Sequence, residues 1–229
     1  LWAGGKELML VYDMQDDSWR TLGEERGVPS GGIWDLYGDS TYIWAASSVG
    51  LRRIERSTRR ESPIGIENLF FNLPVYDIEG VENDIWIGSR SGVFVFNKDN
   101  PQIRQAKDMG RKDFPEMMLR ITALKEFERV IYVVGEMGIA KFNLDEREWD
   151  LIFPSTVYHA KTVYSLAVDK NHIFLGTEDG LFRINKKSGF IREYSFPFIG
   201  QVNALHLDGK TLWLGSSQGL VKFKWKRDL

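Results

Sequence analysis

Five short apolar runs carry, as their second residue, a side chain that could contact a ligand: Trp34, Tyr76, Thr122, Tyr164 and Asn203. Three of these residues are aromatic. Aromatic rings offer a flat surface for stacking, and tyrosine and tryptophan add a polar atom at the ring edge. Gathered around one axis, the four larger side chains, Trp34, Tyr76, Tyr164 and Asn203, predict a surface that stacks on a ligand or grips a peptide. The alternative interpretation is that they wedge neighbouring sheets together.

The loops before these runs add three candidate ligand-binding residues, which are Phe71, Phe114 and His159. Variable loops on a rigid scaffold are common places for binding residues. Of the other two histidines, we expect His172 to be solvated in a turn and His206 to be structural at the end of a strand. No two histidines have the spacing of metal ligands, and the sequence contains no cysteine. The sequence therefore predicts neither a metal site nor a cofactor.

Five arginines lie within nine residues: Arg52, Arg53, Arg56, Arg59 and Arg60. Guanidinium groups bind carboxylates and phosphates through two parallel hydrogen bonds, so this cluster predicts a patch for an acidic partner. Glu55 and Glu61 lie close by in the sequence. The alternative is therefore a solvated turn with local charge pairing.

One segment, residues 215–219, fits the G-x-S-x-G pattern of hydrolases. That motif works at a turn from a strand into a helix, whereas the residues that follow here predict a strand. We therefore interpret its two glycines as turn residues and identify no catalytic residue. A propeller enzyme, either a hydrolase or a lyase with its site at a channel mouth, stays open as an alternative function.

A phrase of thirteen residues occurs six times and determines the expected fold. The copies start near residues 1, 43, 85, 131, 173 and 212. The second residue of each copy is aromatic, and successive aromatics are 42, 42, 46, 42 and 39 residues apart. A period of about 40–45 residues with strand-like composition is typical of propeller blades with four strands.

Each phrase has the pattern of a β-hairpin. In the third copy the apolar residues 85–87 lead to a turn that ends at Gly92, and a second strand runs from there to Asn97. Adding the apolar run before the phrase and a weaker run after it gives strands A, B, C and D of an antiparallel meander. We predict an all-β chain, a β-propeller of four-stranded blades with six repeat units, in a single domain over residues 1–229.

The two ends of the chain hold incomplete repeats. The first lacks strand A and the last lacks strand D, so the sequence leaves open whether the ring closes with six or seven blades and whether strands outside the sequence complete it. In the last strand Lys222, Lys224 and Lys226 alternate with Phe223 and Trp225. Lysines at this spacing are typical of an edge strand, because their charge discourages pairing with another strand. We therefore predict an edge strand that continues through residue 226.

The phrase resembles a known family. Residues 163–185 read VYSLAVDKNHIFLGTEDGLFRIN and residues 75–97 read VYDIEGVENDIWIGSRSGVFVFN. Both are similar to the two-component regulator propeller repeat, although the copies at Leu1 and Ile131 depart from its pattern. The resemblance implies a sensor region of a bacterial signalling protein, in the periplasm or outside the cell. It brings no shared catalytic residues.

Composition narrows the classes of partner. The formal net charge of −2 gives no basic footprint for nucleic acid, and no apolar stretch is long enough for a membrane helix. We therefore expect a non-catalytic propeller that binds a small molecule, a glycan, a protein or a peptide on the face formed by the D–A loops. A purely structural assembly domain is the other alternative. The oligomeric state is left open.

Overall fold

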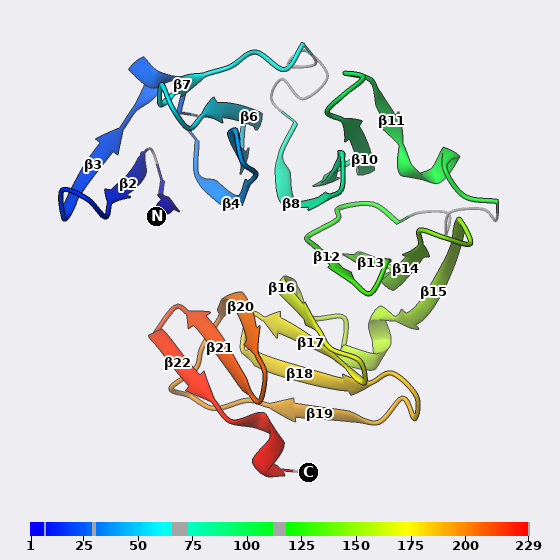
Figure 1. Ribbon diagram of the computed structural model, residues 1–229. Coiled ribbons are helices and arrows are strands. Elements are labelled where there is room, and N and C mark those ends of the chain that lie inside the picture. Colours follow the sequence, from blue (N-terminus) through cyan, green and yellow to red (C-terminus); the bar gives the residue numbers. More distant parts are fainter. Residues whose placement is uncertain (7, 29–30, 66–72, 112–117, 229) are drawn as a thin grey trace. The chain divides into compact units, whose positions relative to one another are not determined.

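The computed structural model describes residues 1–6, 8–28, 31–65, 73–111 and 118–228. These residues form six antiparallel sheets and four short 3-10 helices, and no α-helix occurs among them (Figure 1). The chain divides into two compact units. Unit 1 comprises Leu1–Asp108 with Leu119–Ile121, and unit 2 comprises Met109–Met118 with Thr122–Leu229.

Unit 1 holds the first three sheets, which we call blades 1 to 3. Their strands are β1 (Trp2–Gly4), β2 (Met9–Asp13), β3 (Ser18–Leu22), β4 (Ile33–Gly38), β5 (Tyr42–Ser47), β6 (Gly50–Glu55), β7 (Arg60–Glu61), β8 (Val75–Val81), β9 (Asp84–Ser89), β10 (Gly92–Asn97) and β11 (Ile103–Gln105). Two 3-10 helices, η1 (Glu24–Arg26) and η3 (Ala106–Asp108), follow strand D of blades 1 and 3.

Unit 2 holds blades 4 to 6. Their strands are β12 (Ala123–Phe127), β13 (Val130–Gly135), β14 (Gly138–Asn143), β15 (Glu148–Pro154), β16 (Val163–Val168), β17 (His172–Thr177), β18 (Gly180–Asn185), β19 (Ile191–Tyr194), β20 (Val202–Asp208), β21 (Thr211–Ser216) and β22 (Gly219–Phe223). The 3-10 helices η4 (Ser155–Tyr158) and η5 (Trp225–Asp228) follow β15 and β22.

The predicted fold class is confirmed. Each sheet pairs neighbouring strands in chain order, as a meander does. Blades 2 to 5 contain strands A to D. Among the described residues, blade 1 has only strands B to D and blade 6 only strands A to C. The single domain stays a prediction, and ring closure stays open.

The turn between strands B and C explains the repeated glycine. In blade 2, Gly50 has a φ of 123°, a left-handed conformation that side chains rarely adopt. Its carbonyl oxygen accepts a hydrogen bond from Oγ of Ser47 at 2.7 Å. Ser89 and Gly92 form the same bond in blade 3. The phrase therefore specifies both the shape of this turn and the hydrogen bond that closes it.

The aromatic residue of the phrase forms the core of the blade. Trp44, Trp86 and Phe174 are fully buried. Trp44 packs against Phe96 of the next blade, with ring centroids 5.6 Å apart. Burying a large apolar side chain contributes about 1.5–3 kcal/mol, so the repeated aromatic is a main source of stability for each blade.

A glycine near the end of strand B lets the next blade approach. A Cβ atom added to Gly176 would lie 2.7 Å from both Cγ1 and the carbonyl oxygen of Val202, which opens strand A of blade 6. A Cβ atom added to Gly88 would lie 3.0 Å from Cγ2 of Ile121. The glycine near the end of strand B is therefore required by close packing.

A side chain after strand C joins neighbouring blades. It is the fourteenth residue counted from the start of each phrase. In unit 1, Nζ of Lys98 lies 3.7 Å from Oδ2 of Asp39 in the previous blade. In unit 2, Nζ of Lys186 donates to the hydroxyl of Tyr132 at 3.1 Å. Blade 3 is thus attached to blade 2, and blade 5 to blade 4.

Blade 6 uses Trp225 at this place, and this corrects the prediction of a strand through residue 226. Strand β22 ends at Phe223, and Trp225 turns inward in η5 until its side chain is 0% exposed. Its ring contacts Phe174 and His172, with centroids 5.1 and 5.0 Å away. Because burial of this indole is favourable, the chain leaves the strand conformation after Phe223.

The expectation of a solvated His172 was also wrong. The residue opens β17 and is buried, because Trp225 covers its ring. Its Nδ1 lies 3.2 Å from Oδ1 of Asp169, which also accepts a hydrogen bond from the backbone N–H of His172. The sequence could not reveal this cover, since Trp225 lies 53 residues further along the chain.

Candidate functional site

Strand A carries a β-bulge at the same place in four blades. In blade 2, Ile33 pairs with Ser47 and Asp35 with Ala46, so Trp34 has no partner across the ladder. Blades 3, 5 and 6 have the same shift around Tyr76, Tyr164 and Asn203. A bulge changes the direction of a side chain, and bulges are frequent beside binding sites. All four bulged residues are predicted ligand-binding residues.

In unit 1 the bulges bring Trp34 and Tyr76 together. The two rings are stacked, with centroids 5.0 Å apart and planes inclined by 12°. The side chain of Trp34 is 48% exposed and that of Tyr76 is half-buried. Stacking over only part of the indole leaves aromatic surface in contact with solvent, where another ring could lie.

Two carboxylates lie beside these aromatic residues in the chain. The backbone N–H of Ile78 donates to Oδ2 of Asp35 at 3.1 Å and to Oδ1 of Asp77 at 3.0 Å. The first of these bonds joins blade 2 to blade 3. Since each carboxylate has several acceptor positions, the pair can accept further hydrogen bonds from a ligand. The arrangement combines a stacking surface with hydrogen-bond acceptors.

In unit 2 the bulged residues are Tyr164, which is 39% exposed, and Asn203, which is also exposed. Oδ1 of Asn203 accepts a hydrogen bond from Nε2 of Gln201 at 2.6 Å. This bond holds the amide of Asn203 at the opening of β20. The residue can therefore present its amide nitrogen to a ligand in a defined direction.

His159 belongs to the same end of unit 2, in the connection between β15 and β16. Its side chain is 68% exposed, and Nε2 lies 3.8 Å from Oε2 of Glu193. Next to it, Nζ of Lys161 donates to Glu193 at 2.7 Å and to Asp179 at 2.9 Å. These two hydrogen bonds, to Glu193 first, raise the pKa of Lys161. Lys161 and its two acids therefore form a charged network that His159 borders.

Phe71 and Phe114, the remaining predicted ligand-binding residues, lie outside the described residues. The ligand-binding role of the whole predicted set stays a prediction. Within each unit, however, the described members of this set lie at the same end of the strands, where strand D of one blade connects to strand A of the next.

The arginine cluster spreads over separate local contacts. Arg52 pairs with Glu61 at 3.3 Å, and Arg59 pairs with Asp13 at 3.2 Å. Arg53 lies over the ring of Tyr42, with its guanidinium carbon 4.3 Å from the centroid.

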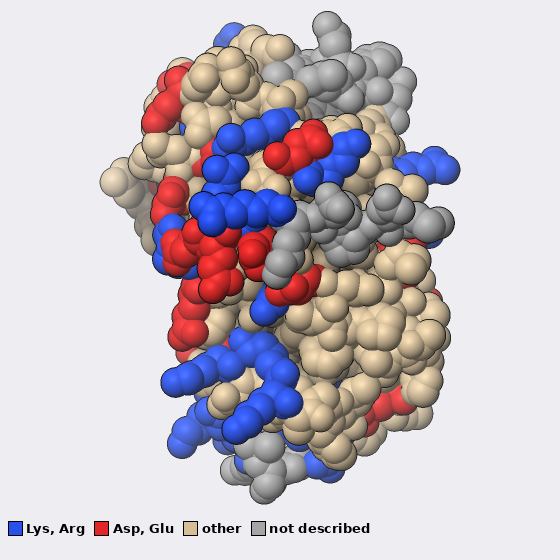
Figure 2. All heavy atoms as spheres, turned by 90° about the vertical axis from the view of Figure 1, so that its right-hand side faces the viewer, with Lys and Arg blue, Asp and Glu red and all other residues tan. Residues whose placement is uncertain are grey.

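Arg56 donates to the carbonyl oxygen of Asp39 at 2.6 Å, and Arg60 lies exposed in β7. On the face drawn in Figure 2, Lys and Arg side chains lie next to Asp and Glu side chains. Most of the five arginines therefore already contact partners within the chain. The patch for an acidic partner stays a prediction.

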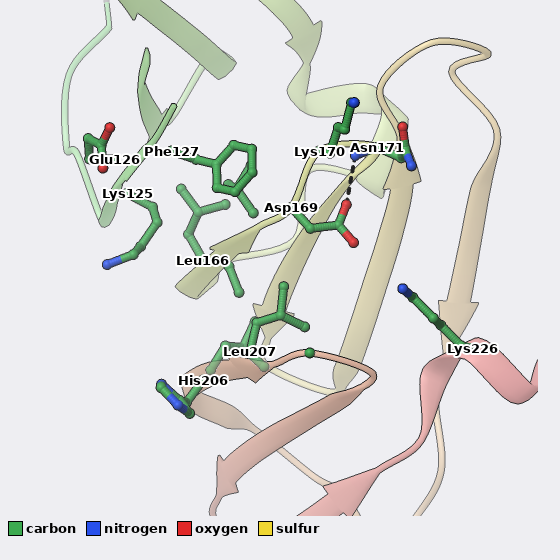
Figure 3. A pocket seen from close by; sticks show the side chains of 14 residues that line it. Lys125, Glu126, Phe127, Leu166, Asp169, Lys170, Asn171, His206, Leu207 and Lys226 are labelled. Atoms are coloured by element: carbon green, nitrogen blue, oxygen red, sulfur yellow. Dashed lines mark hydrogen bonds between the residues drawn. The ribbon is translucent and has the colours of Figure 1, made fainter. Parts of the chain in front are cut away.

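Sequence reasoning missed a hollow in unit 2, at the opposite end of the strands from the bulges. It has a volume of about 590 Å³ and lies among the turns between strands A and B (Figure 3). Among its lining residues are Phe127, Asp169, His206 and Lys226. Exposed His206 thus lies at this hollow, although the sequence suggested only a structural role. The signal in the sequence is Trp225, which stands where two other phrases have lysine, Lys98 and Lys186.

Within the described ranges, no group of three or more histidine and acidic side chains is arranged to hold a metal ion. The same ranges contain no helix with the length and apolar character needed to cross a bilayer.

Comparison with known proteins gives the fold. No protein-family model matches the sequence, and no curated protein is similar to it in sequence. Two similar structures are of the extracellular domain of BT4673 from B. thetaiotaomicron, named in one as a one-component system and in the other as a hybrid two-component system. Their identities are 16% and 20%, both with a TM-score of 0.74 over 97% of this chain.

The chain spans 31% and 30% of those two chains, less than a third of their length. The computationally designed Ika8 protein is also similar, with a TM-score of 0.63 and 15% identity over 96% of this chain and 69% of that one. Likeness at this level of identity concerns the fold. The chain therefore shares the β-propeller blade fold of an extracellular domain from a bacterial signalling protein.

Proposed function

We propose that this chain is the ligand-binding segment of a bacterial sensor protein, built from two-component regulator propeller repeats and located outside the cytoplasm. The resemblance of its phrases to that repeat supports the family. The fold similarity to the extracellular domain of BT4673 supports the sensor role. In this proposal the segment binds its ligand without converting it.

The observation that carries the proposal is the β-bulge repeated in strand A of four blades. A bulge interrupts the hydrogen-bond ladder, so a scaffold that repeats it at one position gains something other than sheet stability. Here it directs Trp34 and Tyr76 away from the ladder in unit 1. We assign the ligand site of unit 1 to these two rings.

Of the ligands considered, an oligosaccharide fits this site best. A sugar ring has C–H groups on its face, which can lie on the exposed part of Trp34, and hydroxyl groups at its edge. Hydroxyl groups are hydrogen-bond donors, and the carboxylates of Asp35 and Asp77 are acceptors. The site thus offers complementary groups to both parts of a sugar.

The test is a glycan array probed with the wild-type protein, followed by calorimetric titration of the strongest binder into variants. Trp34→Ala and the double variant Trp34→Ala/Tyr76→Ala should weaken binding about tenfold or more, since stacked aromatics at binding sites are frequent hot spots. Trp19→Ala is the matched control, because Trp19 is an exposed tryptophan on the outer strand β3.

Binding that survives loss of both rings, or falls equally in the Trp19→Ala protein, would contradict the site. If no oligosaccharide on the array binds, the glycan assignment is wrong. Release of a cleaved product from the bound glycan would show that the protein is an enzyme.

A further inference from the structure

The turn between strands A and B contains an aspartate in both blade 2 and blade 5. Its carboxylate accepts hydrogen bonds through both oxygens in blade 2 but through only one in blade 5. In blade 2, Oδ1 of Asp39 accepts hydrogen bonds from the N–H groups of Thr41 and Tyr42. Oδ2 accepts one from Nε1 of Trp44 at 3.3 Å and lies near Lys98. Both oxygens of this carboxylate therefore have partners in the protein.

Asp169 stands at the equivalent position in blade 5 but uses one oxygen only. Its Oδ1 accepts hydrogen bonds from the N–H groups of Asn171 and His172, at 2.8 and 2.6 Å. Phe174 replaces the donor Trp44, and Trp225 replaces Lys98. Within the described chain, the hydrogen bonds to Asp169 all go to Oδ1, and none reaches Oδ2.

Asp169 is one of the residues that line the hollow of unit 2. Figure 3 shows Lys226 pointing from the C-terminal segment toward the side where Asp169 lies. Among the described residues, no acid lies within ion-pair distance of Lys226, whose Nζ is 5.0 Å from the centroid of its neighbour Trp225. The hollow thus contains one carboxylate and one ammonium group that are not paired with each other.

The rest of the lining is partly apolar. Phe127, Leu166 and Leu207 come from strand A of three successive blades and line the same hollow. In Figure 3 they lie toward the middle of the view, whereas Lys125, Lys170 and His206 point outward. A volume of about 590 Å³ is within the range of small-molecule sites.

From these features we infer that the hollow of unit 2 binds a small zwitterion with an apolar side chain, as an α-amino acid has. The ligand's ammonium group would donate to Oδ2 of Asp169, and its carboxylate would accept from Nζ of Lys226. The side chain would cover Phe127 and Leu207. This site is separate from the proposed glycan site and does not depend on it.

The test uses three probes that share a phenyl group, titrated into the whole chain by calorimetry. L-phenylalanine carries both charges, 3-phenylpropionate only the negative one and phenethylamine only the positive one. Hydrogen bonds to charged groups are stronger than those between neutral groups, and solvent weakens them at an open site. We therefore expect each analogue to bind about five- to tenfold more weakly than phenylalanine.

Variants identify the two contacts. Asp169→Asn keeps an oxygen for the turn and should weaken phenylalanine about fivefold or more while leaving 3-phenylpropionate unchanged. Lys226→Met should weaken phenylalanine similarly and leave phenethylamine unchanged. Because Lys226 is exposed, its variant should fold even if Asp169→Asn does not.

Matched controls are Asp208→Asn, in the equivalent turn of blade 6, and Lys187→Met, an exposed lysine outside the hollow. Neither should change the affinity for phenylalanine. The inference is overturned if phenylalanine does not bind, if it binds no better than both analogues, or if the controls weaken it as much as the test variants. Retained affinity in Lys226→Met would also overturn it.

Discussion

The indole of Trp34 lies on the phenol ring of Tyr76, with the planes inclined by 12° and the centroids 5.0 Å apart. The two residues are 42 positions apart in the sequence and occupy the same place in neighbouring blades. Their contact means that the repeat brings equivalent side chains together at the start of strand A. It also offers a direct measure of how the blades of unit 1 cooperate.

A double-mutant cycle on Trp34→Ala and Tyr76→Ala should reveal this contact as a coupling in the free energy of unfolding. Stacked aromatic pairs contribute about 0.5–1.5 kcal/mol beyond the area that they bury. Urea unfolding of the wild type, both single variants and the double variant measures the coupling. Additive single effects would contradict the stack.

The variant Asp39→Asn should change how stability depends on pH. Burial by itself raises the pKa of Asp39, but the N–H groups of Tyr42 and Thr41, with Trp44 and Lys98, outweigh it and lower the pKa. A lowered pKa in the folded state stabilises the protein fully above the unfolded value of about 4. This stabilisation is lost as the pH falls through the lower folded value.

The measurement for Asp39 is the free energy of unfolding between pH 7 and pH 2.5. Asp39→Asn should be less stable than wild type at neutral pH, and the difference should shrink below about pH 4. Asp208→Asn, in the equivalent turn of blade 6, is the control and should follow wild type. A difference that is constant across this range would show that the charge of Asp39 contributes nothing.

Substituting Gly176 by alanine should destabilise unit 2 by about 1–3 kcal/mol, because the new methyl group would meet Oγ of Ser165 in its own blade and the backbone and side chain of Val202 in blade 6. Gly215 is the same position of the phrase in blade 6, where an added Cβ atom has Ala204 as its nearest contact at 3.3 Å. Gly215→Ala should therefore cost much less. Equal effects of the two substitutions in thermal unfolding would contradict the close packing around Gly176.

Replacing Trp225 by alanine should cost about 3–5 kcal/mol, as for other fully buried aromatic residues. The substitution removes the cover from His172 and Phe174. Trp19→Ala is a suitable control, because its side chain is 54% exposed and surface changes usually cost about 0.5 kcal/mol or less. A small loss for Trp225→Ala in urea unfolding would mean that η5 contributes little to blade 6.

The sequence by itself determined the local elements, because each is encoded within one phrase. Gly50 and Ser47 specify the turn between strands B and C, and the buried Trp44 specifies which face of the sheet is covered. Apolar alternation and turn residues act over a few positions, so their pattern can be counted in a single sequence. The predicted order of strands in all six repeats follows from this.

Contacts between blades were decided by the tertiary structure alone. The bulges could not be predicted, because a bulge depends on how two strands pair and the two possible registers differ little in local sequence. Nothing in the sequence around Asp169 shows that one of its oxygens lacks a donor; that follows from Phe174 and Trp225, which come from two different phrases. Pairing of residues far apart in the chain depends on the packing of whole sheets, and local residue preferences do not contain that information.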